Sequence, residues 1–104
     1  MSTAELCGVI DEISAFGAEI VAWSGIAMHE VDVGGPNPGS FTVGAKEVFG
    51  EAPVVPPVRL VEGGKIRRDI EGVVLRNSRT REINALNIRA RLAAIGRTRE
   101  RIHE

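Results

Sequence analysis

The stretch MHEVDVGGPNPGS, residues 28–40, decides how this 104-residue chain is organised. Before it, residues 17–31 are rich in β-branched and aromatic side chains, which favour extended chain, and we expect a break at Ser24-Gly25. After it, residues 32–58 contain five glycines and all five prolines of the chain, a composition typical of an ordered loop. The sequence therefore predicts strands up to residue 33 that run into a glycine- and proline-rich loop.

Shorter signals lie on either side of these segments. Residues 3–16 have apolar side chains at helical spacing but are interrupted by Gly8, so they leave helix and strand open. A short helical turn is expected at Val43–Phe49. The stretch PPVRLVEGG, residues 56–64, favours a short strand that its two glycines end, because proline is tolerated at the start of a strand.

The last forty residues have the periodicity of two helices. The first has an apolar face and is expected to end near Arg76, because Asn77-Ser78 interrupts the pattern. Thr80 suits the start of the second helix. The apolar face of the second helix is expected to consist of Ala85, Ile88, Leu92 and Ile95. The prediction is an α+β fold forming one partial domain over residues 1–104, with strands in 1–33, the loop and a short strand in 34–64, and helices in 65–104.

The size and composition predict a small core. The chain has three Phe, one Trp and no Tyr, and a domain of this length buries a modest fraction of its surface. We therefore expect neighbouring chains to hold it in place, with Ile88, Leu92 and Ile95 packing partly across a chain boundary. The start of the chain lacks the basic residues of a signal peptide, and acids interrupt its apolar stretch, so no membrane span and a cytoplasmic location are expected.

The net charge of −1 hides an asymmetry between the two halves of the chain. Residues 1–64 carry a net charge of −7, whereas residues 65–104 carry +6, with ten arginines. This pattern allows either a nucleic-acid-binding surface or a solvated or subunit-facing helix. Arg89 and Arg91 project about 200° apart on a helix, so they form no single stripe for a phosphate backbone. We therefore expect no nucleic-acid partner.

Four blocks in a fixed order carry a resemblance to a known family. The first is a strand that ends at His29, followed by Asp32-Val33-Gly34-Gly35 and Pro38-Gly39-Ser40. The others are PPVRLVEGG, the helix end RNSRT at residues 76–80, and the helix around residues 88–94. Together, over residues 17–102, they resemble the hydantoinase B family, which includes subunits of N-methylhydantoinases, 5-oxoprolinases, and acetone and acetophenone carboxylases.

The resemblance implies a segment of a larger hydantoinase B-type fold that is not active alone. The implied function is a component of a hetero-oligomeric ATP-dependent hydantoinase or oxoprolinase, which hydrolyses cyclic amides, or of an acetone or acetophenone carboxylase-like enzyme. The implied partners are a hydantoinase A-type subunit that binds ATP, the remaining hydantoinase B-type chains and a small-molecule substrate. The rival interpretations are a non-catalytic assembly segment and an arginine-rich nucleic-acid-binding domain.

The resemblance also implies a divalent metal, either Mn, Zn or Fe. In carboxylase relatives an H-x-x-D pair holds the metal together with a histidine at the position of His29. At the upstream position where that pair would fall, this chain has Ala4 and Cys7. The proline that usually follows the R-T of the family is Arg81 here. The missing ligands imply either a split subunit or an inactive truncation.

The candidate site residues cluster around the opening stretch. His29 is the candidate metal ligand, because a neutral imidazole is a common ligand of these metals. Strand alternation places His29 and Val31 on one face and the carboxylates of Glu30 and Asp32 on the other, unless the chain turns. Asp32 is the candidate catalytic residue. A structural histidine is the alternative for His29.

Substrate binding is predicted for the glycine loop, at Gly34, Gly35, Gly39 and Ser40. Glycine leaves backbone N–H groups accessible to a carbonyl or carboxylate group. A purely structural turn is the alternative. The loop lacks the Gly-Lys-Ser/Thr ending of a P-loop, so ATP is not expected here, and Ser40 has no accompanying histidine–aspartate pair that would make it a nucleophile.

Overall fold

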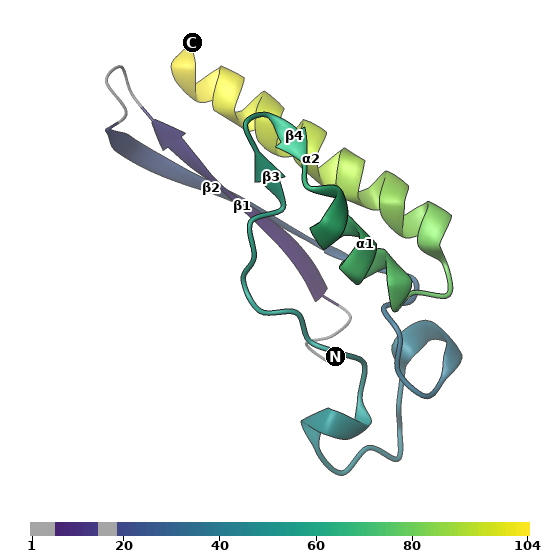
Figure 1. Cartoon of the computed structure of the whole chain (residues 1–104). Coiled ribbons are helices and arrows are strands. Elements are labelled where there is room, and N and C mark those ends of the chain that lie inside the picture. Colours follow the sequence, from purple (N-terminus) through teal and green to yellow (C-terminus); the bar gives the residue numbers. More distant parts are fainter. Residues whose placement is uncertain (1–5, 15–18) are drawn as a thin grey trace.

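The computed structural model describes residues 6–14 and 19–104 (Figure 1). The α+β fold predicted from the sequence is confirmed: strands come first, a long loop follows, and two helices end the chain. The elements are β1 (Leu6–Ser14), β2 (Ile20–His29), two 3-10 turns (Pro38–Ser40 and Val48–Gly50), β3 (Val61–Glu62), β4 (Lys65–Ile66), α1 (Arg68–Arg76) and α2 (Arg81–His103).

Strands β1 and β2 form a long antiparallel hairpin whose register runs from the Leu6–His29 pair to the Ile13–Ala22 pair. Residues 3–16, for which the sequence left helix and strand open, therefore form a strand over their described part, Leu6–Ser14. The expected break at Ser24-Gly25 is wrong: both residues lie inside β2 and pair with β1. Ladder hydrogen bonds from the partner strand keep a single glycine extended. Ala4 lies outside the described residues.

Helix α2 packs along one face of this hairpin, and the core lies between them (Figure 1). Side chains of β2 alternate between exposed and half-buried, as expected for a hairpin covered on one face only. Ile88 and Ile95 of α2 are 3% and 6% exposed. The expectation that these two residues pack across a chain boundary is therefore wrong, because they are buried within the chain.

The buried face of α2 is partly polar. Its buried residues are Asn84, Ile88, Arg91 and Ile95, whereas Leu92 of the predicted face is only half-buried. The helix continues through Gly96, and it begins after Thr80 as predicted. Polar side chains occupy two of the four buried positions, so acceptors must lie opposite them.

The short hairpin β3–β4 precedes α1 and turns at Gly63-Gly64, which have φ angles of 58° and 75°. These glycines therefore reverse the chain into a second strand and do not simply end the first, because positive φ is readily adopted only by glycine. Helix α1 ends at Arg76 as the sequence predicted, and the connection through Asn77-Ser78 leads to α2.

The loop over residues 41–58 extends away from the helices (Figure 1). Its helical turn lies at Val48–Gly50, later than the predicted Val43–Phe49. Its apolar side chains are largely exposed, and Phe49 reaches 89%. Single exposed apolar residues are common, but a run of them marks a surface suited to another protein. Among the described residues, no helix is long and apolar enough to cross a membrane.

Candidate functional site

The four residues after Met28 alternate between the two faces of the strand, as the sequence predicted. His29 and Val31 are exposed, whereas Glu30 and Asp32 are buried. The buried pair faces α2 and the connection between the two helices, because its hydrogen-bond partners come from there. The exposed pair therefore lies on the open face of the hairpin.

Glu30 is held by two side chains of α2. Arg91 donates from Nη1 to Oε1 of Glu30, and Asn87 donates from Nδ2 to Oε2 at 2.7 Å. The ion pair is almost dry, with side-chain exposures of 2% for Glu30 and 4% for Arg91. Positions 87 and 91 are one helical turn apart, so both donors reach the carboxylate from the same helix face. Both oxygens of Glu30 are thereby engaged.

The Asp32 carboxylate accepts four hydrogen bonds. Its Oδ1 accepts from the backbone nitrogens of Gly34, at 2.9 Å, and Arg79, at 3.2 Å. Its Oδ2 accepts from the backbone nitrogen of Gly39, at 2.8 Å, and from Nη1 of Arg79, at 3.0 Å. The loop is thus closed around a carboxylate of its own chain, and Arg79 joins it to the helix connection.

Two further contacts anchor the backbone of Asp32. Its carbonyl oxygen accepts from Oγ of Ser78 and from Nδ2 of Asn84, each at 2.7 Å. The Arg79 guanidinium also donates to the carbonyl oxygens of Gly35 and Asn37, at 2.6 and 3.2 Å. The RNSRT motif and the glycine loop therefore form one hydrogen-bonded unit, in which Arg79 contacts residues more than forty positions away.

The surroundings of Asp32 favour its charged form. Burial raises the pKa of this carboxyl, but hydrogen bonds from the backbone of Gly39, Arg79 and Gly34 and from the Arg79 side chain lower it more, so that the pKa lies below its usual value. A general base works best with a pKa near the working pH. The catalytic role of Asp32 stays a prediction, and its contacts favour a structural one.

The glycine loop uses positive backbone angles to approach its own chain. The φ angles are 107° at Gly34 and 88° at Gly35. A Cβ at Gly34 would lie 2.7 Å from the carbonyl oxygen of Asn77, and one at Gly35 would lie 3.1 Å from Cα of Ala52. Both glycines are therefore required for close backbone packing within this chain.

The remaining loop groups also have internal partners. The Ser40 hydroxyl donates to the carbonyl oxygen of Gly34 and accepts from the backbone nitrogen of Val33, both at 2.8 Å. The backbone nitrogens of Gly34 and Gly39 are engaged by Asp32. Substrate binding by Gly34, Gly35, Gly39 and Ser40 stays a prediction, and these contacts give the loop a structural role.

His29 presents an exposed imidazole at the end of β2. It is the last residue of β2, it pairs with Leu6, and its side chain is exposed. Within residues 6–14 and 19–104, no group of three or more His, Cys, Asp or Glu side chains is placed to hold a metal ion. Glu30 and Asp32 lie on the other face with their oxygens engaged. Among the described residues, His29 therefore lacks the further ligands that would complete a metal site.

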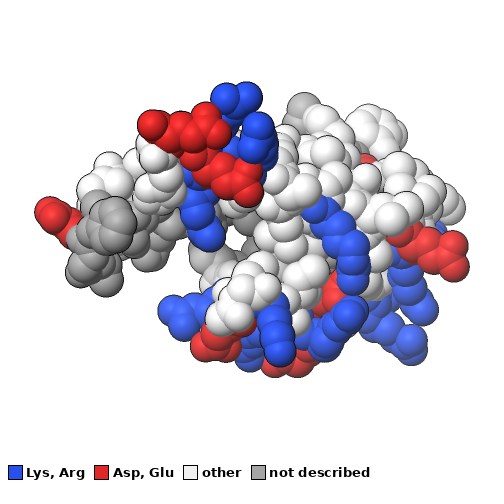
Figure 2. All heavy atoms as spheres, turned by 90° about the horizontal axis from the view of Figure 1, so that it is seen from above, with Lys and Arg blue, Asp and Glu red and all other residues white. Residues whose placement is uncertain are grey.

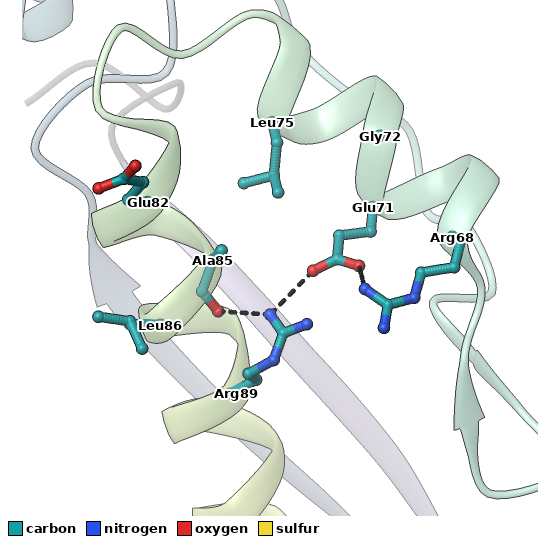
Figure 3. Close-up of a pocket in the computed structure, with 8 residues that line it drawn as sticks. All are labelled: Arg68, Glu71, Gly72, Leu75, Glu82, Ala85, Leu86 and Arg89. Atoms are coloured by element: carbon teal, nitrogen blue, oxygen red, sulfur yellow. Dashed lines mark hydrogen bonds and ion pairs between the residues drawn. The ribbon is translucent and has the colours of Figure 1, made fainter.

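A second polar cluster lies in the cleft between α1 and α2 (Figure 3). The buried carboxylate of Glu71 accepts from Nη1 of Arg68 at 3.1 Å and from Nη1 of Arg89 at 2.9 Å. Leu75 and Leu86 line the same cleft. The two arginines neutralise Glu71 and join the helices, whereas the exposed Glu82 also lines this cleft.

The arginines of the second half are largely paired with acids. Arg91 binds Glu30 and Arg89 binds Glu71, so these two neighbours on α2 contact different elements. On the face drawn in Figure 2, Lys and Arg side chains alternate with Asp and Glu and form no continuous stripe. Part of the charge asymmetry is therefore balanced within the chain, because Arg79 and Arg91 of the basic half bind Asp32 and Glu30 of the acidic half.

Sequence reasoning missed the polar anchors on α2 and before it. The sequence places Arg79 in the RNSRT motif and predicts no role for Asn84, Asn87 or Arg91 as an anchor. The signal was present, because positions 84, 87 and 91 are spaced i, i+3 and i+7 and fall on one helix face. The apolar spacing predicted Ala85 and Leu92 on the buried face of α2, whereas the neighbouring residues Asn84 and Arg91 are the buried ones.

Comparisons with known proteins agree with this arrangement of motifs. The family model described as hydantoinase B/oxoprolinase matches residues 9–104. The chain is 31% identical over 87 residues to an uncharacterized protein of Methanocaldococcus jannaschii, covering 84% of this chain and 16% of that protein. It is 33% identical over 79 residues to the caprolactamase subunit beta of Pseudomonas jessenii, covering 76% and 14%.

A third relative is the acetophenone carboxylase delta subunit of Aromatoleum aromaticum, 31% identical over 90 residues, covering 86% of this chain and 13% of that subunit. The matched segment thus spans only 13–16% of the length of these relatives. No solved structure matches the chain significantly.

Proposed function

The chain belongs to the hydantoinase B/oxoprolinase family, and we propose that it contributes one histidine ligand to a metal-containing active site of a multi-subunit hydrolase or carboxylase. Two of its relatives are named as enzyme subunits, one for caprolactam and one for acetophenone. Each of these compounds carries a carbonyl group. The proposed substrate is accordingly a cyclic amide or a ketone, bound mainly by other parts of the assembly.

The observation that carries the proposal is the presentation of His29. Its imidazole is exposed on the open face of the hairpin, while Glu30 and Asp32 are both held on the opposite face. The proposed nitrogen ligand therefore lies at the end of a paired strand, and the carboxylates of Glu30 and Asp32 point away from it. A solvated histidine on a mobile loop would lack this support.

The proposed metal is Mn, Zn or Fe. When bound, a divalent ion of this kind polarises a carbonyl group or activates a water molecule. The contribution of this chain is to hold the His29 imidazole in place, since Asp32 closes the neighbouring loop through Gly34 and Gly39. The remaining ligands and ATP binding are assigned to partners, namely other hydantoinase B-type chains and a hydantoinase A-type subunit.

Elemental analysis of the purified assembly tests the proposal, with His29→Ala compared with His103→Ala. His103 is the other histidine of the chain and lies exposed at the end of α2. We expect His29→Ala to lower the content of divalent metal and abolish turnover, and His103→Ala to change neither. His29→Gln should not restore the metal, because an amide is a weaker donor than imidazole. Equal metal content in all four proteins would refute the ligand role.

A second candidate function is a non-catalytic assembly segment. It is favoured by the exposed apolar side chains of residues 41–58, which suit a protein interface. Phe49→Ser would then reduce co-purification of the partner subunits without changing metal content. Loss of partners from Phe49→Ser, together with no effect of His29→Ala on metal, would favour this function over the first.

A further inference from the structure

The end of β2 depends on side chains of α2 for its position. Within the described residues, the Leu6–His29 pair is the last pair of the β1–β2 ladder at this end. The next residue, Glu30, is instead held by Arg91 and Asn87. The direction of the strand at His29 is therefore fixed on one side by backbone pairing and on the other by buried side chains.

We infer that Arg91 and Asn87 act through Glu30 as positioning residues for His29, an inference that rests on the proposed metal-binding role of this histidine. Successive strand residues point to opposite faces, so holding Glu30 against α2 turns His29 outward. Because Asn87 and Arg91 engage different oxygens of the carboxylate, Glu30 cannot rotate without breaking a bond. Helix α2 thus sets the orientation of a side chain on the far face of the strand.

The energetics of buried ion pairs support a geometric role. Two charges removed from water gain little net stability over apolar side chains of similar volume, because their desolvation offsets their attraction. Glu30 and Arg91 are nonetheless almost fully buried. An apolar pair would not fix the orientation of residue 30, whereas the hydrogen bonds of Glu30 do.

A second anchor fixes the chain two residues further on. The carbonyl oxygen of Asp32 accepts from Asn84, also on α2, and from Ser78. Asn84, Asn87 and Arg91 lie on one face of the helix, at spacings of three and four residues. The segment from His29 to Asp32 is therefore attached to α2 at both buried positions, and Glu30 is the anchor adjacent to the histidine.

The test separates geometry from stability by replacing the ion pair with an apolar pair. The double variant Glu30→Met/Arg91→Met removes both charges and keeps side-chain volume, so the thermal midpoint should stay close to that of the native protein. The control is Arg97→Met/Glu100→Met, which removes an exposed ion pair on the same helix with the same change in charge. Each is made in the full chain and purified in its assembly.

The readout is Co²⁺ binding to the metal-depleted assembly, followed by its visible absorption bands. We expect the Glu30→Met/Arg91→Met variant to bind Co²⁺ about 10–100-fold more weakly, with altered bands, as when residues that orient a ligand are removed. The Arg97→Met/Glu100→Met control should match the native protein. Arg91→Lys, which keeps the charge opposite Glu30, should recover part of the affinity.

Two further variants make every outcome decisive. If the double variant does not fold, Asn87→Ala removes only one hydrogen bond to Glu30 and should still weaken Co²⁺ binding several-fold. Native affinity and bands in a folded double variant or in Asn87→Ala, with binding lost in His29→Ala, would overturn the positioning role alone. Unchanged binding in His29→Ala would instead overturn the proposed ligand role and the inference with it.

Discussion

Replacing Asp32 by asparagine tests whether this carboxylate holds the glycine loop to the helix connection. Oδ1 accepts from the backbone nitrogens of Gly34 and Arg79, and Oδ2 accepts from the backbone nitrogen of Gly39 and from Nη1 of Arg79. In either orientation, the asparagine places its NH₂ group against two donors. Asp32→Asn therefore loses two hydrogen bonds and leaves two donors unpaired.

The magnitude follows from these losses. A typical net hydrogen bond contributes about 1 kcal/mol, and a buried unpaired donor costs about 1–3 kcal/mol. The Arg79 side chain is 41% exposed, so its guanidinium can turn towards water and its share is discounted. The free energy of unfolding should therefore fall by about 2–4 kcal/mol.

Hydrogen exchange measured by mass spectrometry can follow this change in the chain alone or in its complex. We expect Asp32→Asn to lose amide protection in the segments that contain Gly34, Gly39 and Arg79, while the centre of β2 keeps its protection. Asp69→Asn is the matched control, because Asp69 pairs with Arg67 on the surface. Native protection around Gly34 and Gly39 in Asp32→Asn would show that the carboxylate does not organise the loop.

Three further predictions concern packing and pH. Gly39→Ala should lower the free energy of unfolding by about 1–2 kcal/mol because of the positive φ at this position. Gly34→Ala should lower it clearly more, because the added Cβ would also lie 2.7 Å from a backbone oxygen. Urea unfolding compares the two variants, and equal losses would contradict the clash at Gly34. The pKa of Asp32 is lowered in the folded state, so the ionised carboxylate stabilises the fold above its usual pKa of 3.8, and this stabilisation is lost as the pH falls through the folded-state pKa. In an acid titration, the stability of Asp32→Asn should not show this loss. Ile88→Ala should cost about 2–5 kcal/mol in thermal unfolding, whereas Leu86→Ala, at an exposed position of the same helix, should change it little.

Much of the fold was predictable from local patterns. The helix end at Arg76, the start of α2 after Thr80 and the loop around Gly34 and Gly35 all follow from spacing and turn chemistry. The break predicted at Ser24-Gly25 was wrong because strand pairing with β1 overrides a local preference. The site was predictable only in part: alternation placed His29 opposite Glu30, but no local rule gave either residue its neighbours.

The sequence by itself determined the family, the succession of a strand, a glycine- and proline-rich loop and two helices after residue 17, and the face on which His29 lies. These depend on motifs and on periodicities that act within a few residues. Only the tertiary structure decided which donors hold Glu30 and Asp32, because Arg91 is 61 residues from Glu30 and Arg79 is 47 residues from Asp32. A buried charge is costly unless it is paired, and here the paired residues are brought together by the packing of α2 against β2. No local stretch of sequence contains both partners, so the pairing could not be predicted from it.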